Sequence, residues 1–475
     1  MPHNEARRVS KNTLMLMFGT ACRLVFSFAF VIYVASLMGL ESFGSYSLGI
    51  HYFELFLSLT ATAIGIFITR EAGRRPARLS NLLTHALVLV AALAVVSAGL
   101  MVTVGSVFNY AEQTRLVLLI ASLALLPASA AVVLEAAFVA LEQAQFVTSG
   151  TALESVLRIV LSYAALSAGY GLASLFWILV FTRLLLAVFY GVSLARRVPL
   201  RVRFRVRRFR VFAWRWRVFA VENWLATIYT TLDVVILSVL HGEAAVGLYT
   251  AAGKVVRLGS IAAKCYTTAV FPVMSRRYAQ SQAAFEQLVR DTLRILLAVM
   301  LPAATVAVVL ADRVMGVLFA ERYAAAIPVL QVLAGVMLLE CLNPFLSHTL
   351  FAKGQQSRSM KVAAIGLVVN TASTIWFASQ WGAVGAACGT LVGSSAACIS
   401  YCLYSFDRRD IYQLLSIAAK VSLAAAALAL VLLVLPAGHV AVAMLAASVV
   451  YLLLVVMFRV ITATDLRIFQ KQAAA

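Results

Sequence analysis

The chain has 475 residues, of which 63% are hydrophobic and only 12% are charged, and its formal net charge is +20. Soluble proteins of this size carry charged residues at roughly 25% of their positions, so the composition excludes a soluble protein and places much of the surface against lipid. The excess positive charge must therefore lie in loops or in a water-filled cavity.

Apolar stretches of about 20 residues, long enough to cross a bilayer as helices, follow one another along the whole chain. In lipid only helices and closed barrels satisfy their own backbone, and barrel strands would be shorter and alternate strictly. The sequence therefore predicts an all-α, polytopic membrane protein with about 14 transmembrane helices. The predicted spans are 13–38, 43–68, 81–108, 115–141, 145–168, 171–195, 214–240, 245–271, 287–311, 326–352, 359–379, 382–405, 412–435 and 438–458.

Positive residues predict the orientation of these spans, because cytoplasmic loops carry an excess of Lys and Arg. With a cytoplasmic N-terminus, the segments on that side carry 28 Lys and Arg residues, and the segments on the other side carry 3. The bias predicts a multi-pass protein with an even number of spans and with both termini in the cytoplasm.

The stretch "RRVPLRVRFRVRRFRVFAWRWR", residues 196–217, holds ten arginines and links the sixth predicted span to the start of the seventh. Such a run is also typical of nucleic-acid binding. Here the alternation of arginines with apolar residues suits a segment that lies against anionic lipid headgroups. We therefore expect membrane lipids and no nucleic acid as the partner, with substrate gathering or partner docking as alternatives.

Motifs of catalysis and metal binding do not occur in the sequence. The six cysteines all fall in predicted spans without a C-x-x-C spacing, and there is no G-x-x-x-x-G-K-[ST], H-E-x-x-H or G-x-S-x-G motif. The predicted outer loops are too short for a catalytic domain. We expect a protein that is not an enzyme, with no catalytic residues, no metal and no cofactor.

Two pairs of segments indicate an internal repeat. "LESFGSYSLGIHYFELFLS" resembles "GEAAVGLYTAAGKVVRLGS" at an offset of 203, which aligns Gly44 with Gly247 and Tyr46 with Tyr249. "ALEQAQFVTSG" resembles "AKGQQSRSMKV" at an offset of 212. Six crossings return the chain to the side of the membrane where it started. Two consecutive six-helix copies therefore have the same orientation in the membrane. This predicts two lobes related by a pseudo-two-fold axis along the membrane normal, with a cavity between them.

The repeat predicts the domain boundaries. The predicted regions are an N-lobe of helices 1 to 6 (1–195), a basic cytoplasmic linker (196–213), a C-lobe of helices 7 to 12 (214–408), and two additional helices with a cytoplasmic tail (409–475).

The lobes, the segments "FGSYSLG" and "VGLYTAAGKV" after the first and seventh spans, and "FPVMSRRYA" at the end of the eighth resemble one transporter family. This is the polysaccharide-transporter branch of the multidrug/oligosaccharidyl-lipid/polysaccharide exporter superfamily, which includes the Wzx-type O-antigen flippases. The resemblance covers nearly the whole chain. It implies a flippase in the bacterial inner membrane that carries an undecaprenyl-diphosphate-linked oligosaccharide to the outer leaflet by alternating access, for O-antigen, capsule or exopolysaccharide. It also implies a downstream polysaccharide polymerase as a partner.

Three other functions compete with this one. A peptidoglycan lipid-precursor flippase has a substrate with the same diphosphate and a similarly cationic cavity. A cation-coupled multidrug antiporter of the same superfamily typically uses a carboxylate in helix 1, whereas the first span here has no acidic residue and contains Arg23. A membrane-embedded glycosyltransferase or polymerase would require acidic metal ligands or a large outer loop.

Cations inside the predicted spans are candidates for the binding site, because an ionised group in hydrocarbon must face a partner or water. Lys254, Arg257 and Lys264 fall within an arc of about 80° on one helix, and no carboxylate shares that face. Arg23 lies near the middle of the first span. Such a cationic lining suits a diphosphate, which Arg binds with paired donors. These four residues are the predicted substrate-binding residues.

Three acidic residues are predicted ion-coupling sites or charge partners: Glu54, Asp233 and Glu340. The alternative to a binding site is that the cations pair across helices, Arg23 with Glu54 and Lys254 with Asp233. Glu340 is either a proton site or a partner for the three cations of the eighth span.

In the fifth span Glu154 and Arg158 are four residues apart, which predicts a structural ion pair. Arg183 in the sixth span has no predicted role.

Overall fold

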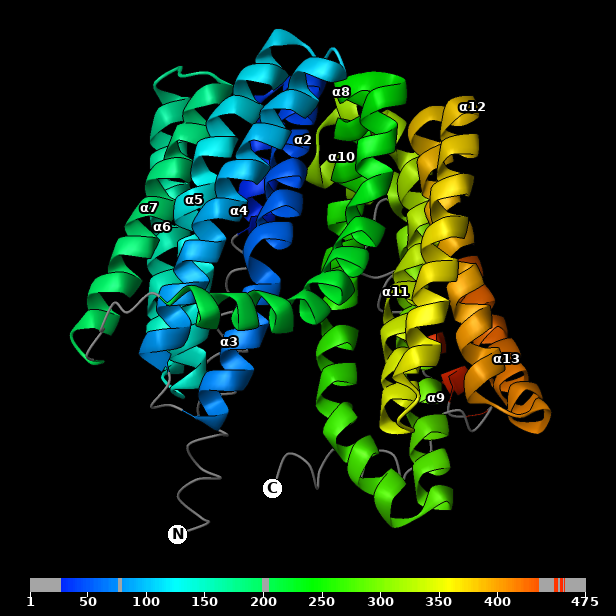
Figure 1. Ribbon diagram of the computed structural model, residues 1–475. Helices are drawn as coiled ribbons and strands as arrows, with labels where there is room; N and C mark the ends of the chain where they lie inside the picture. Colours follow the sequence, from blue (N-terminus) through cyan, green and yellow to red (C-terminus); the bar gives the residue numbers. More distant parts are fainter. Residues whose placement is uncertain are drawn as a thin grey trace. The chain divides into compact units, whose positions relative to one another are not determined.

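The structure is a computed structural model that describes residues 27–75, 79–198, 205–434 and 448–457, apart from 452 and 456. Every element in these ranges is a helix, which confirms the all-α fold (Figure 1). The elements are α2 (Leu40–Leu57), the π-helix η1 (Ser58–Thr62), α3 (Ala63–Arg74), α4 (Leu79–Val107), α5 (Glu112–Ala140), α6 (Ala144–Ser167), α7 (Leu172–Ala195), α8 (Val206–Gln280), α9 (Gln282–Val309), α10 (Ala311–Leu318), the 3-10 helix η3 (Glu321–Ala326), α11 (Ile327–Ala352), α12 (Gln356–Ser405) and α13 (Arg408–Val434).

Nine helices of the described part of the chain are long and apolar enough to cross a membrane, which confirms a polytopic membrane protein. The helix α4 coincides with the predicted span 81–108 to within a few residues. The first and last predicted spans, 13–38 and 438–458, lie largely outside the described residues. The number 14 therefore stays a prediction.

Two pairs of neighbouring predicted spans appear as single helices with an internal break. In α8 the break is Gly242, which has a φ of 73°, and in α12 it is Gly382, with a φ of 55°. Both values lie in the left-handed region that favours glycine. Each glycine therefore marks the point where one predicted span ends and the next begins.

The chain forms two compact units, Met1–Gly247 and Leu248–Ala475. The first unit contains α2 to α7 and the first part of α8, and the second contains the remainder. The lobe and linker boundaries expected from the sequence stay predictions.

In the first unit, α5 is the central helix and packs against α2, α3, α4 and α7. Close packing depends on small residues at the contacts, as is usual between membrane helices. A Cβ atom on Gly150 would lie 2.5 Å from the ring of Tyr190, which is fully buried beside Phe138. The ring of Tyr190 thus occupies the space that Gly150 leaves in α6.

The π-helix η1 joins α2 to α3 and is held by polar side chains. The wider turn of a π-helix frees backbone carbonyls from their usual partners. Trp224 Nε1 donates to the carbonyl of Leu59 at 2.9 Å, and Asn223 Nδ2 donates to the carbonyl of Ser58 at 3.2 Å. Thr60 Oγ1 donates to the Phe56 carbonyl at 2.6 Å. The first part of α8 therefore supplies hydrogen bonds that this irregular turn requires.

The first turn of α2 lies directly against the segment that follows the break in α8. A Cβ atom on Gly44 would overlap the carbonyl of Glu243, and one on Gly247 would lie 2.8 Å from the carbonyl of Leu40. The repeat aligned these two glycines. Both are buried at one contact inside the first unit.

The side chain of Glu243 also caps α5. Its Oε1 accepts hydrogen bonds from the Ala111 amide at 3.2 Å and from Thr114 Oγ1 at 2.9 Å. The residue that precedes α5, Ala111, has no capping side chain of its own. A carboxylate at a helix N-terminus is also favoured by the helix dipole.

In the second unit, α11 packs against α12 and α9, and α9 packs against α13. Gly385, Gly389 and Gly393 are four residues apart and therefore share one face of α12. A Cβ atom on Gly389 or Gly393 would overlap Thr374 or Asn370, which belong to the first half of the same helix. These glycines allow the two halves of α12 to pack closely.

Candidate functional site

The three predicted cations of α8 lie in the second unit, in the part of the helix that begins after Gly242. Lys254 is half-buried, Arg257 is exposed, and the Lys264 side chain is partly exposed. The structure therefore places all three on one helix of one unit. Arg23 lies outside the described residues.

Lys264 forms an ion pair with Glu340 of α11, with Nζ and Oε2 2.7 Å apart. Ser260 Oγ also donates to this carboxylate oxygen at 3.3 Å, and Cys341 Sγ donates to the Ser260 carbonyl at 3.9 Å. Of the roles considered for Glu340, the geometry fits a partner for the cations. Lys264 is thus neutralised in this structure.

Arg257 differs from Lys264 because it has no carboxylate within ion-pair distance among the described residues. Its side chain is exposed on an apolar helix that is long enough to span a membrane. A guanidinium in that setting needs water or an anionic ligand. Of the α8 cations, Arg257 is therefore the best placed to bind an external anion.

The two acidic candidates of the first unit, Glu54 and Asp233, differ in burial. Glu54 is exposed on α2. Asp233 is 7% exposed, and its Oδ1 accepts from the Val234 amide at 2.9 Å. Four residues after Glu54, Ser58 begins η1, and its Oγ bonds to Thr227 Oγ1 at 2.6 Å.

The sequence predicted the wrong ion-pair partner for Glu154 in the first unit. Glu154 of α6 pairs with Arg183 of α7 at 3.3 Å, whereas the sequence predicted a pair with Arg158. The i,i+4 rule describes neighbours on an isolated helix surface. Here Glu154 is only 9% exposed and lies at the contact with α7, where Arg183 reaches it.

Because Glu154 pairs with Arg183, Arg158 has no carboxylate within ion-pair distance in the described part of the chain. Its guanidinium lies 5.9 Å from the ring centroid of Phe30 and also interacts with the hydroxyl of Tyr46. Arg158 is half-buried in the middle of α6. The contacts that the structure shows for Arg158 are therefore with aromatic side chains.

We expect Glu154→Gln to lower the thermal stability of the purified protein more than the double substitution Glu154→Gln/Arg183→Gln. The single change leaves Arg183 unpaired in a largely buried site, which costs about 3 kcal/mol, whereas the double change removes both charges. The measurement is thermal unfolding in detergent, with Arg158→Gln as the control. A decrease with Arg158→Gln as large as that with Glu154→Gln would favour the i,i+4 pair instead.

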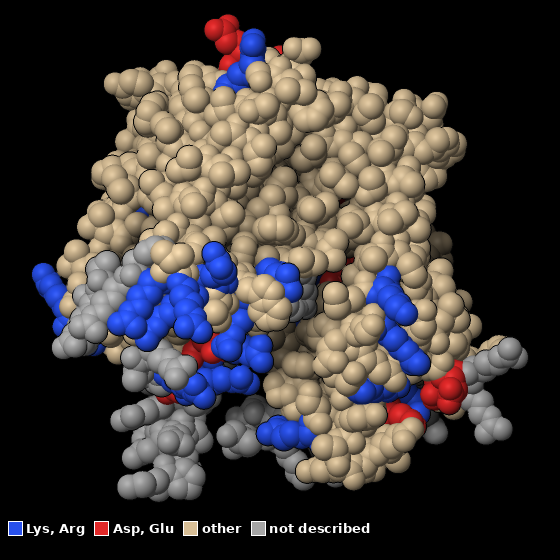
Figure 2. Space-filling view, in the orientation of Figure 1, with Lys and Arg blue, Asp and Glu red and all other residues tan. Residues whose placement is uncertain are grey.

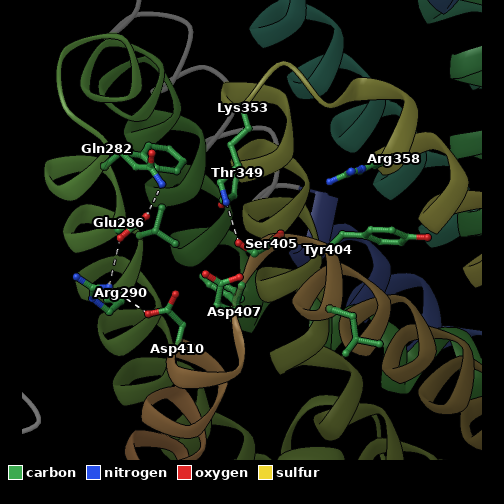
Figure 3. A pocket seen from close by; sticks show the side chains of 14 residues that line it. Gln282, Glu286, Arg290, Thr349, Lys353, Arg358, Tyr404, Ser405, Asp407 and Asp410 are labelled. Atoms are coloured by element: carbon green, nitrogen blue, oxygen red, sulfur yellow. Dashed lines mark hydrogen bonds and ion pairs between the residues drawn. The ribbon is translucent and has the colours of Figure 1, made fainter.

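The second unit has a pocket of about 410 Å³ where the ends of several helices meet (Figure 3). Arg290 of α9 pairs with Asp410 at 3.2 Å and with Glu286 at 4.0 Å. Lys353 Nζ donates to the Ser405 carbonyl at 2.8 Å. This pocket was not predicted from the sequence, because its lining comes from three separate segments, 282–290, 349–358 and 403–410.

Burial lowers the pKa of the Lys353 ammonium in this pocket, and the carboxylates of Glu286, Asp407 and Asp410 partly offset that effect. Positive and negative side chains are thus mixed within the pocket. An anion bound there would compete with the protein's own carboxylates. The pocket is therefore a weaker anion site than Arg257 or Arg158.

Within the described residues, no group of three or more His, Cys, Asp and Glu side chains could hold a metal ion. The chemistry that the cationic side chains of each unit offer is anion binding. Arg257 and Arg158 offer guanidinium groups with paired donors, and Lys264 could exchange Glu340 for a ligand.

Two family models match the chain. Residues 9–278 match the model described as "Polysaccharide biosynthesis protein", and residues 219–376 match the model described as "MatE". A curated relative, the probable low-salt glycan biosynthesis flippase Agl15 of Haloferax volcanii, is 23% identical over 177 residues. That alignment covers 37% of this chain and 38% of the relative.

Several solved structures are similar in fold. The lipid II flippase MurJ in an inward closed conformation has a TM-score of 0.77 at 13% identity, over 94% of this chain and 98% of that chain. An inward-facing multidrug resistance transporter of the MATE family has a TM-score of 0.71 at 19% identity, over 83% and 96%. A transporter of the same superfamily from Pyrococcus furiosus has a TM-score of 0.60 at 18% identity, over 86% and 96%.

Proposed function

Because the chain belongs to the polysaccharide biosynthesis protein family, within the polysaccharide-transporter branch of the multidrug/oligosaccharidyl-lipid/polysaccharide exporter superfamily, we propose that it is a flippase for a lipid-linked glycan. The proposed substrate is an undecaprenyl-diphosphate-linked oligosaccharide for surface polysaccharide. It moves from the cytoplasmic to the outer leaflet of a bacterial inner membrane by alternating access. A downstream polysaccharide polymerase is the proposed recipient.

The observation that carries the proposal concerns two arginines, of which Arg257 lies in a helix that is long and apolar enough to cross a membrane. Arg257 and Arg158 have no carboxylate within ion-pair distance among the described residues. Keeping such groups in a membrane-spanning helix is costly unless they serve a ligand or a water-filled path. A diphosphate offers several acceptor oxygens and about two negative charges, which match guanidinium groups.

The same observation bears on the alternatives. A cationic drug would be repelled by Arg257 and Arg158, which disfavours a multidrug antiporter. The peptidoglycan lipid precursor shares the diphosphate, so the cations do not separate it from a surface-polysaccharide substrate. The fold similarity to the lipid II flippase keeps that alternative open.

We expect an inside-negative membrane potential to accelerate outward movement of the lipid-linked glycan. Moving one charge across 100 mV corresponds to about 2.3 kcal/mol, so two charges contribute roughly 4–5 kcal/mol. The empty site, with its cations, is drawn back inward. The measurement uses proteoliposomes with a potassium–valinomycin potential, no pH gradient and no sodium. An impermeant enzyme reports the glycan that reaches the far leaflet.

Parallel vesicles with the peptidoglycan precursor and with a cationic dye test the two alternatives directly. Movement of the dye in preference to either diphosphate lipid would reject the flippase. Transport that ignores the potential but follows an imposed pH or sodium gradient would reject the potential as the driving force. It would direct attention to Glu54 and Glu340 as ion-coupling residues.

A further inference from the structure

One end of the first unit carries a dense group of exposed arginines, here called the arginine face. They come from the end of α3, the end of α7 and the start of α8, and Figure 2 shows basic side chains gathered over this region. The arginine face consists of Arg70, Arg74, Arg75, Arg196, Arg197, Arg205, Arg207, Arg208, Arg210, Arg215 and Arg217.

No arginine of this face has a carboxylate within ion-pair distance in the part of the chain that the structure describes. Exposed arginines in proteins are commonly interspersed with acidic residues. Here positive side chains predominate, although acidic side chains also lie among them (Figure 2). Such a surface attracts an anionic partner that lies outside the protein.

The start of α8 fixes which way its arginines point. Phe209, Phe212, Trp216 and Ala220 are buried or partly buried at helical spacing against the core of the first unit. The Phe212 ring lies 5.1 Å from that of Phe67 in α3. In the sequence, arginines alternate with apolar residues along this stretch, which suggests a repeat of two residues. From Val206 onward, however, the residues form a helix. The arginines therefore occupy the remaining helix faces together.

The exposed side of this helix is also partly apolar. Val206, Val211 and Trp214 are 64%, 49% and 62% exposed, and Trp214 lies beneath the guanidinium of Arg217 at 4.6 Å. The helix lies crosswise to the long helices of its unit (Figure 1). Amphipathic helices with arginine and tryptophan that lie across the spanning helices are typical of the headgroup region.

We propose that the arginine face binds the phosphate headgroups of anionic phospholipids. Exposed apolar residues of α7 continue to within a few residues of this face, with Val188 and Val192 about half exposed. The arginines thus begin where the lipid-facing surface of α7 ends. A nucleic acid would satisfy the charge but would not cover Val206, Val211 and Trp214, whereas a lipid surface satisfies both.

The test compares lipid binding by the full-length protein and by the variant Arg207→Gln/Arg208→Gln/Arg210→Gln/Arg215→Gln. Native mass spectrometry counts the lipids retained from detergent micelles that contain phosphatidylglycerol or phosphatidylcholine. Each arginine near an anionic surface is worth about fivefold in affinity. We expect the wild-type protein to prefer phosphatidylglycerol and the variant to lose at least tenfold of that affinity.

The matched control is Arg276→Gln/Arg277→Gln/Lys361→Gln/Lys420→Gln, which removes the same charge from exposed residues of the second unit. It should retain phosphatidylglycerol, and circular dichroism should show that both variants are folded. Equal lipid retention by the two variants would overturn the proposal. So would tighter binding of an oligonucleotide than of phosphatidylglycerol by the wild-type protein at the same salt concentration.

Discussion

Arg257→Ala is expected to reduce transport of the lipid-linked glycan roughly 10- to 100-fold while the amount of folded protein in the membrane stays unchanged. A charge-assisted hydrogen bond is worth about 1.5–3 kcal/mol, which corresponds to this range. Arg257 is exposed and has no described carboxylate partner, so its removal leaves no buried charge behind. The measurement is transport in proteoliposomes at equal protein content.

The neighbouring cation, Lys264, provides the control for a purely structural role, because it pairs with Glu340. Lys264→Glu alone should impair the protein because it places a carboxylate beside Glu340, and the swap Lys264→Glu/Glu340→Lys should restore stability. If the swap also restores full transport, Lys264 acts only as a structural partner. Unchanged transport by Arg257→Ala would contradict the proposed role of Arg257 in binding the diphosphate.

Gly44→Ala is expected to lower the melting temperature of the purified protein by several degrees or to prevent its accumulation. The added Cβ atom would overlap the backbone carbonyl of Glu243, which cannot move aside as a flexible side chain could. Overpacking of this kind typically costs 1–3 kcal/mol and sometimes more. Thermal unfolding in detergent measures the effect.

Gly99→Ala is the matched control. Gly99 lies within α4 of the same unit, and a Cβ atom there would meet nothing within 4 Å. Alanine is favoured over glycine inside a helix by roughly 0.5–1 kcal/mol, so this change should leave stability equal or higher. Similar melting temperatures for the two variants would show that the contact at Gly44 relaxes at little cost.

Sequence reasoning predicted the helices well because each is encoded locally. The hydropathy of about 20 consecutive residues marks a span, and α4 and α5 appear close to the predicted 81–108 and 115–141. The repeat aligned Gly44 with Gly247 but did not predict their contact, which the structure shows. The local hydropathy pattern was enough for the helices.

The charge partners could not be predicted in the same way. Whether Glu154 pairs with Arg158 or with Arg183 depends on how α6 is rotated against α7, and the sequence of α6 alone does not contain that rotation. The pairing of Lys264 with Glu340 joins residues 76 positions apart. The pocket beside Lys353 likewise depends on helix ends that meet only in the folded chain.

Because of the π-helix at Ser58–Thr62, the deletion of one residue in this segment would change the structure beyond the segment itself. A π-helical turn amounts to one extra residue within an α-helix, and one residue corresponds to a rotation of about 100°. Loss of a single residue here would restore a regular helix and rotate everything that follows. Phe67 would turn away from Phe212, and Arg70 would turn away from Phe219, which it now faces at 5.5 Å. A one-residue deletion in this turn would thus change the contacts of every residue of α3. The same deletion in a loop would change only the loop.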